Sequence, residues 1–178
     1  PQVIRRNLQT LCTALDVTYD PAEDEARAQQ ALRHAKALLG DTEIAIDYTA
    51  TPAPMSLARC LIEHGLRVSR IYADSIAAGD LDDFRWLQEH APDLSLYATV
   101  EVKLRVLPRE TQRPMLAIGQ KAAYFTGTRH FVNIVEGGGM YGFDGICRLC
   151  ARIEEAFLTA RDPRNYIQQK GLGCESCL

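Results

Sequence analysis

Apolar side chains recur along the chain with two alternating periods, one typical of helices and the other of strands. Spacings of three and four residues predict amphipathic helices, and short apolar runs between them predict buried strands. The pattern predicts helices over residues 3–15, 21–39, 55–64, 80–90, 120–126 and 143–159, with a helical turn at 102–107. It predicts strands over residues 43–48, 67–73, 94–100, 114–118 and 131–135. Strands and helices therefore alternate from residue 43 onward.

This alternation determines the expected fold class. Strands joined by helices form parallel βαβ units with right-handed crossovers. We expect one α/β domain over residues 1–178, with a doubly wound, Rossmann-like, mainly parallel sheet of about five strands. Two N-terminal helices precede the first strand, and we expect them to pack across the sheet or against a surface outside this chain. The second should begin at Pro21 after an Asp20 cap and end at Gly40.

The loops after the strands are the expected ligand-binding positions. In doubly wound sheets, ligands bind at the carboxyl ends of the strands, near the point where the strand order reverses. The loop Thr49–Pro54 lacks the G-x-G-x-x-G spacing of dinucleotide-binding loops, and the chain has no G-x-x-x-x-G-K-[ST] motif. These two absences argue against ordinary NAD and ATP binding.

The loop Gly119-Gln120-Lys121 follows the fourth predicted strand and opens a helix. A glycine there permits close approach by a ligand, and a helix N-terminus together with a lysine suits an anion. The alternative is a turn glycine beside a solvated lysine. We treat all three residues as candidate ligand-binding residues.

A second glycine-rich loop follows the fifth predicted strand and contains Gly137, Gly138 and Gly139. Three consecutive glycines cost backbone entropy, and they suit a chain that turns tightly beside a bulky group. The alternative is a flexible connection. We include the three glycines among the candidate ligand-binding residues.

Composition and charge exclude several classes of function. The 178 residues are 47% hydrophobic and 24% charged, with a net charge of −3, as in ordinary globular domains. A broad electrostatic nucleic-acid interface is not expected from this balance, because phosphate binding needs clustered Lys and Arg. We expect no membrane span and find no secretory signal pattern, which predicts a cytoplasmic protein with reduced thiols.

The six cysteines include two C-x-x-C pairs, Cys147 with Cys150 and Cys174 with Cys177. The 23 residues between the pairs, 151 to 173, are close to the spacing of four-thiolate metal sites. These four cysteines are candidate metal ligands. Cys150, however, falls on the apolar stripe of a predicted helix, and a redox dithiol is another alternative. The remaining two, Cys12 and Cys60, are expected to be buried small hydrophobes.

Three segments carry a family resemblance: Ala117–Tyr124, Phe131–Val135 and Tyr141–Ile146. Their order and spacing resemble the C-terminal domain of nitrogenase component 1 proteins. That family includes the molybdenum–iron protein subunits, cofactor-assembly scaffolds and the nitrogenase-like reductases of tetrapyrrole biosynthesis. The G-x-K-x-x-Y pattern in the first segment looks like the family loop beside the metal cofactor, and Lys121 matches the lysine that helps to hold the cofactor's organic acid.

The resemblance implies a function in which this chain is one part of a larger assembly. The family fold has three α/β domains per subunit, and this chain would be the third, acting as a nitrogenase-like oxidoreductase domain. It would line a metallocofactor or substrate pocket in ATP-dependent reductive chemistry and would not be active alone. An iron–sulfur cluster or metallocofactor would be shared with domains outside this chain. The implied partners are those domains or a paired component 1 subunit, and an ATP-dependent iron–sulfur reductase.

Two departures from the family pattern leave alternatives open. Residues 132–136 contain no histidine, and His130 comes slightly earlier than the family's metal-binding histidine. Metal ligation of that type, and dinitrogen reduction with it, is therefore not expected. The cysteine-containing tail is not part of the family pattern either. The alternatives are a cofactor-assembly scaffold module and an interaction domain that binds zinc or an iron–sulfur cluster through its paired cysteines.

Overall fold

The centre of the fold is a five-stranded sheet whose neighbouring strands are all parallel. The computed structural model describes residues 1–106 and 114–163. The strands are β1 (Glu43–Asp47), β2 (Arg67–Ala73), β3 (Ser95–Ala98), β4 (Met115–Ile118) and β5 (Phe131–Val132). Their order is β3-β2-β1-β4-β5, so the direction of winding reverses between β1 and β4. This arrangement confirms the predicted doubly wound α/β fold.

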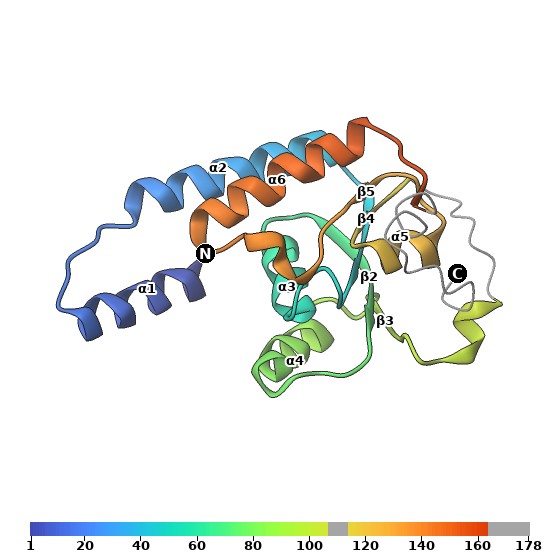
Figure 1. The fold of residues 1–178 in the computed structure, drawn as a ribbon, viewed down its shortest axis with the longest axis horizontal. Coiled ribbons are helices and arrows are strands. Elements are labelled where there is room, and N and C mark those ends of the chain that lie inside the picture. Colours follow the sequence, from blue (N-terminus) through green and yellow to red (C-terminus); the bar gives the residue numbers. More distant parts are fainter. Residues whose placement is uncertain (107–113, 164–178) are drawn as a thin grey trace.

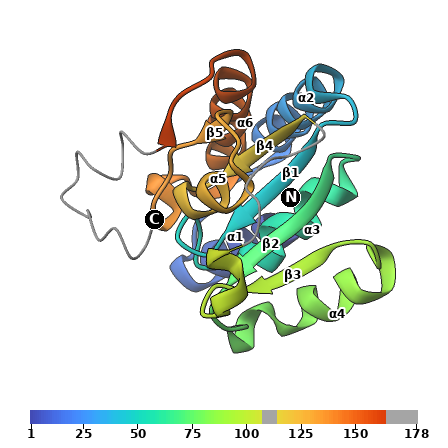
Figure 2. The same cartoon turned by 90° about the vertical axis from the view of Figure 1, so that its right-hand side faces the viewer.

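Helices cover both faces of the sheet, as Figures 1 and 2 show. One face carries α2 (Ala22–Leu39), α3 (Pro54–Glu63), α4 (Leu81–His90) and α6 (Gly142–Leu158). The other face carries the shorter α5 (Gln120–Thr126). Short 3-10 turns occur at η1 (Ala78–Asp80), η2 (Val102–Arg105) and η3 (Glu136–Gly139). The carboxyl ends of β1, β4 and β5 thus meet at one edge between these two helical layers.

The core is divided between the two faces of the sheet. Strand β1 is buried along its whole length, as expected for a parallel strand covered on both sides. Ile44 and Ile46 belong to the larger core, under α2, α3 and α6, whereas Ala45 belongs to the smaller core under α5. The central strands therefore form a rigid support for the loops at their ends.

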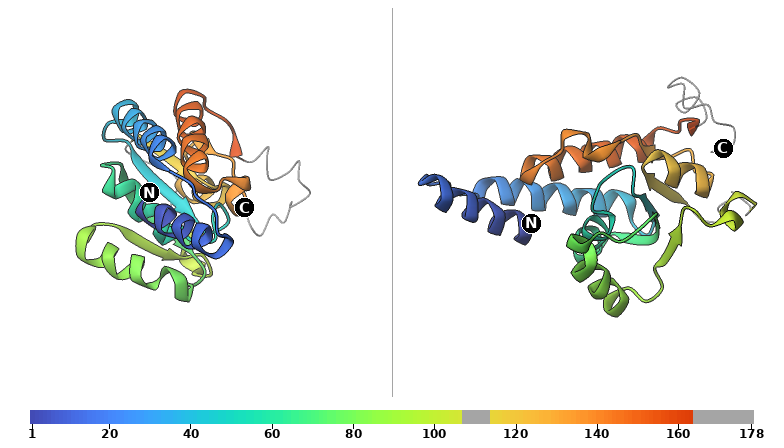
Figure 3. Two further views of the ribbon diagram at one scale, coloured as in Figure 1. Left: turned by 90° about the vertical axis from the view of Figure 1, so that its left-hand side faces the viewer. Right: turned by 60° about the horizontal axis from the view of Figure 1, so that its bottom comes forward.

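The two N-terminal helices behave differently from each other. Helix α2 packs beside α6 on the sheet, and its buried stripe includes Leu32 and Leu39. Helix α1 (Gln2–Leu15) extends away from the sheet, and none of its side chains is buried within the part of the chain that the structure describes (Figure 3). Only α2 meets the expectation of packing across the sheet. Cys12 on α1 and Cys60 on α3 are half-buried rather than buried, which corrects our prediction for both.

Element boundaries differ from the predictions mainly at the sheet edges. Strand β3 is shorter than the predicted 94–100, and β5 contains only Phe131 and Val132 of the predicted 131–135. Both strands lie at an edge of the sheet and have one neighbouring strand each. After β5, the Asn133 side chain accepts a hydrogen bond from Gln120 at the start of α5, and Glu136 adopts a positive φ of 50°, which ends the extended conformation.

Within residues 1–106 and 114–163, no helix has both the length and the apolar character that crossing a bilayer requires.

Candidate ligand-binding site

Three loops meet at the carboxyl edge of the sheet, where the strand order reverses. Strand β1 leads into residues 48–53, β4 leads into Gly119, and β5 leads into residues 133–141. Backbone hydrogen bonds join the first and third loops: Glu136 N–H donates to Thr49 O at 2.8 Å and Gly137 N–H donates to Ala50 O at 2.7 Å. The structure therefore brings both predicted ligand-binding loops to one edge, beside the β1 loop.

Lys121 and Tyr48 form the polar pair at the centre of this edge. The Lys121 ammonium donates a hydrogen bond to the Tyr48 hydroxyl oxygen, and Nζ lies 4.3 Å from the centroid of the Tyr48 ring. Both side chains are half-buried. Among the described residues, no carboxylate lies within ion-pair distance of Lys121. Within residues 1–106 and 114–163, the positive charge of this pair therefore has no ion-pair partner at the reversal point.

The hydrogen-bond chemistry of this pair suits an anion. An ammonium group has three donors and no acceptor, so two donors of Lys121 are left after the bond to Tyr48. Because Tyr48 accepts from Lys121, its own hydroxyl hydrogen is available to a further acceptor. Bonds from charged donors to carboxylate or phosphate oxygens are stronger than neutral ones. The two side chains together can bind one anionic group.

Gln120 is held by another loop of the same edge. Its amide nitrogen donates to the Asn133 side-chain oxygen at 2.6 Å, and its side chain is buried. This bond connects the start of α5 to the end of β5. The predicted role of Gln120 as a ligand donor stays a prediction.

The Asp47 carboxylate lies beneath this edge and is completely buried. It accepts hydrogen bonds from Thr49 N–H at 2.8 Å, Ala50 N–H at 3.1 Å and Ala122 N–H at 2.7 Å, and from the Thr49 hydroxyl. The first turn of α5 thus donates to a carboxylate of the protein itself. An anion at this edge would consequently depend on the Lys121 and Tyr48 side chains.

The glycine residues at this edge allow the β4 loop to lie close to Asp47 and the β5 loop to turn tightly. Gly119 has a φ of 109°, and a Cβ atom there would lie 2.2 Å from Asp47 Oδ2. In η3, Gly137, Gly138 and Gly139 have φ values of 78°, 55° and 73°, which other residues rarely adopt. Tight turning of the backbone explains these three glycines, and their contact with a ligand stays a prediction.

A groove of about 860 Å³ opens beside the glycine turn, between α1, α3 and α6. Its apolar lining includes Leu57, Ile118, Ile134, Met140, Ile146 and Leu149. The volume lies within the range of small-molecule sites. Ala50, Thr51 and Gly137 belong to the lining, so this groove reaches the loops at the carboxyl edge, whereas Tyr48 and Lys121 are not among its lining residues.

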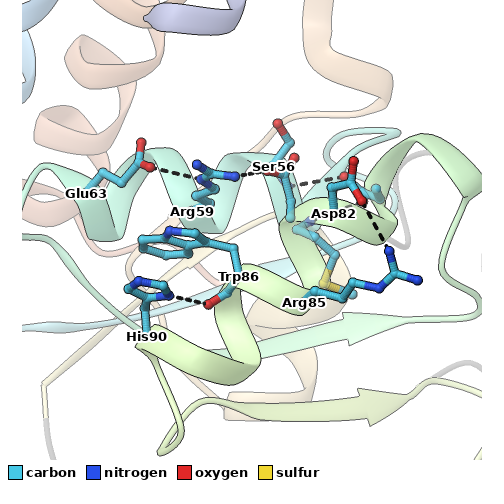
Figure 4. Close-up of polar contacts among 10 residues, drawn as sticks. Ser56, Arg59, Glu63, Asp82, Arg85, Trp86 and His90 are labelled. Carbon is cyan, nitrogen blue, oxygen red and sulfur yellow. Dashed lines mark hydrogen bonds and ion pairs between the residues drawn. The ribbon is translucent and has the colours of Figure 1, made fainter.

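The polar rim of the groove is fixed by contacts between α3 and α4 (Figure 4). Arg59 donates to Glu63 at 2.9 Å and to Asp83 at 3.0 Å. Its guanidinium carbon also lies 4.9 Å from the centroid of the Trp86 ring, which stacks on His90. Two carboxylates pair with Arg59, whereas no carboxylate among the described residues lies within ion-pair distance of Lys121.

The first cysteine pair lies on α6 with unequal exposure. Cys147 is half-buried, whereas Cys150 belongs to the core, where burial raises the pKa of its thiol to about 12. A thiol must lose its proton to bind a metal. In the described ranges, no three His, Cys, Asp or Glu side chains are arranged to hold a metal ion. Cys174 and Cys177 lie outside these ranges, and the four-cysteine site stays a prediction.

His130 lies at the amino end of β5, away from the loops described above. Its Nδ1 atom is 3.0 Å from the Ala156 carbonyl oxygen of α6. Residues 132–136, which follow it, contain no histidine.

Sequence reasoning missed Asp47, Tyr48 and Asn133. The apolar pattern makes Tyr48 the last residue of a strand, and its partner Lys121 is 73 positions away in the sequence. An aspartate at the end of an otherwise apolar strand was the one available signal, because a buried carboxylate needs donors from neighbouring loops.

Comparison with solved structures identifies a similar fold. A chain of the structure described as "Nitrogenase Cp1 at pH 6.5" superimposes with a TM-score of 0.62 and 14% sequence identity. The match covers 89% of this chain and 38% of the nitrogenase chain. Neither a family model nor a curated protein matches the sequence. The chain therefore has a nitrogenase-like fold and spans just over a third of the length of that relative.

Proposed function

We propose that this chain is a domain of a nitrogenase-like oxidoreductase and lines a pocket for an anionic metallocofactor or substrate in ATP-dependent reductive chemistry. The observation that carries the proposal is the Lys121–Tyr48 pair at the reversal point of a nitrogenase-like fold. Doubly wound sheets bind their ligands at this position. Lys121 binds the anionic group, Tyr48 donates a second hydrogen bond, and the groove beside Gly137 receives the rest of the ligand.

The residues present fit one end of such a cofactor. Lys121 and Tyr48 supply donors for an organic acid or another anionic group. Metal ligands would come from elsewhere, because the described residues contain no cluster that could hold a metal ion. When bound, the cofactor supplies electron transfer, and the residues of this chain bind and orient its anionic end.

The remaining parts of the reaction belong to partners. The chain spans 38% of the nitrogenase chain that it resembles in fold. Under this proposal, other domains or a paired component 1 subunit complete the pocket. An ATP-dependent iron–sulfur reductase delivers electrons to the assembly.

Calorimetric titration with citrate, a small tricarboxylate, tests the anion site. We expect Lys121→Ala to weaken citrate binding about tenfold, because it removes the charged donor. The matched control is Lys36→Ala, which removes the same charge at the amino edge, where Lys36 donates to Gly40 O. Equal affinities of the wild type and the Lys121 variant would contradict the proposal. Such a result would favour the alternative of a metal-binding interaction domain, which has no need of Lys121.

A further inference from the structure

We infer that Asp47 is a positioning residue, which holds Tyr48 and Lys121 in the geometry that binds an anion while making no contact with the ligand itself. This inference rests on the proposed function, because it concerns the same site. It concerns a residue that no sequence motif indicates and that lies completely out of solvent.

The carboxylate joins the two loops that carry the anion-binding pair. Oδ1 accepts from the backbone of Thr49 and Ala50, which follow Tyr48 directly. Oδ2 accepts from the backbone of Ala122, which follows Lys121 directly. One side chain therefore fixes the residue next to each member of the pair, across the reversal point of the sheet.

The β4 loop packs closely against the Asp47 carboxylate at this point. A Cβ atom at Gly119 would lie 2.2 Å from Asp47 Oδ2 and 2.7 Å from Oδ1, so the β4 loop contacts the carboxylate directly. Asp47 is buried at the end of β1, which is itself buried along its whole length. The donors are thus held by a side chain that the core immobilises.

The Asp47 carboxylate acts only as an acceptor, of four hydrogen bonds. An asparagine amide cannot replace it, because one of its two polar groups is a donor. The two oxygens of Asp47 accept from three backbone N–H groups and the Thr49 hydroxyl. In Asp47→Asn, one oxygen becomes an NH₂ group, which would face a donor of one of the two loops. That loop must shift, and the Tyr48–Lys121 geometry shifts with it.

The direction in which the citrate affinity of Asp47→Asn changes distinguishes a positioning role of Asp47 from a purely electrostatic one. Removing a negative charge near an anion site should tighten anion binding if charge alone mattered. Loss of positioning should weaken it. We expect Asp47→Asn to weaken citrate binding at least fivefold, and we expect the Lys121 side-chain ¹³Cε resonance of the ligand-free protein to move. Unchanged or tighter citrate binding would overturn the inference.

Two further variants distinguish a loss of positioning from a loss of stability. Leu32→Ala destabilises the core of α2, far from the loops, and should leave the citrate Kd of the folded protein and the Lys121 resonance unchanged. Thr49→Val removes one of the four donors and should weaken citrate binding in the same direction but less, so it serves if Asp47→Asn does not fold. Full citrate affinity in Thr49→Val would then overturn the inference. If Lys121→Ala also binds citrate normally, the proposed function itself has failed.

Discussion

Burial raises the pKa of Asp47 above that of an ordinary aspartate, and hydrogen bonds from Thr49, Ala122 and Ala50 oppose this increase. The carboxyl group therefore keeps its proton to a higher pH in the folded protein than in the unfolded chain. At the scale of single residues, a buried carboxyl group thus lies beside the half-buried side chain of Lys121. We propose that the first sets the backbone geometry and that the second binds the ligand.

The raised pKa of Asp47 predicts how stability changes with pH. Between the ordinary aspartate pKa and the higher pKa of Asp47, the folded state binds more protons than the unfolded state, so the free energy of unfolding contributed by this group falls as pH rises. We expect the stability of the wild type relative to Asp47→Asn to decrease between pH 4 and neutral pH in urea denaturation. A relative stability that increases with pH would show that folding favours the charged carboxylate.

The sequence indicated some site residues and not others for a physical reason. Gly119 and Lys121 are recognisable because they follow a strand and open a helix, which is local information. Tyr48 and Asn133 become relevant through partners in other loops, and no short-range pattern reports such contacts. Cys150 was correctly placed on an apolar stripe, because helical periodicity does report burial.

At the scale of elements, hydrophobic periodicity predicted the order of helices and strands because buried faces repeat regularly. It failed where an element ends for a local reason, as in β5, where the chain turns toward η3 after Val132. The helix predicted at α1 is present but does not pack across the sheet, and the alternative that it packs against a surface outside this chain stays a prediction. Periodicity shows that one face of a helix is apolar, but that face becomes buried only where another element packs against it.

The start of α6 gives a prediction at this scale. A Cβ atom at Gly145 would lie 2.6 Å from the Met140 carbonyl carbon, so the helix packs directly on the preceding loop. We expect Gly145→Ala to lower the free energy of unfolding by about 1–3 kcal/mol, as overpacking does. Gly79→Ala is the matched control, because nothing lies within 4 Å of its Cβ position, and it should cost less than about 0.5 kcal/mol. Equal stabilities of the two variants in urea denaturation would contradict this packing.

At the scale of the whole molecule, one helix stands apart from the body of the fold (Figures 1 and 3). Helix α1 exposes Val3, Leu11 and Leu15, and Arg5 pairs with Glu25 of α2. The chain also spans only 38% of the nitrogenase chain of similar fold. The body of the domain, from α2 to α6, therefore contains the core that determines its stability.

Deletion of residues 1–16 tests this division. Because α1 buries no side chain among the described residues, and an ion pair such as Arg5–Glu25 contributes up to about 1 kcal/mol, we expect the deletion to cost no more than that. Leu32→Ala provides the comparison, since removing a buried leucine side chain costs about 2–5 kcal/mol. Urea denaturation of the three proteins measures both effects. A deletion as costly as Leu32→Ala would show that α1 belongs to the core.

An amide NMR titration with citrate tests whether an anionic group binds at the carboxyl edge, where the strand order reverses. We expect the largest shifts at residues 48–51 and 120–122 and at Gly137, and we expect Lys121→Ala to need about tenfold more citrate for the same shifts. Shifts confined to the amino edge, around residues 41–43 and 115, would contradict this expectation, as would an unchanged citrate dependence in Lys121→Ala.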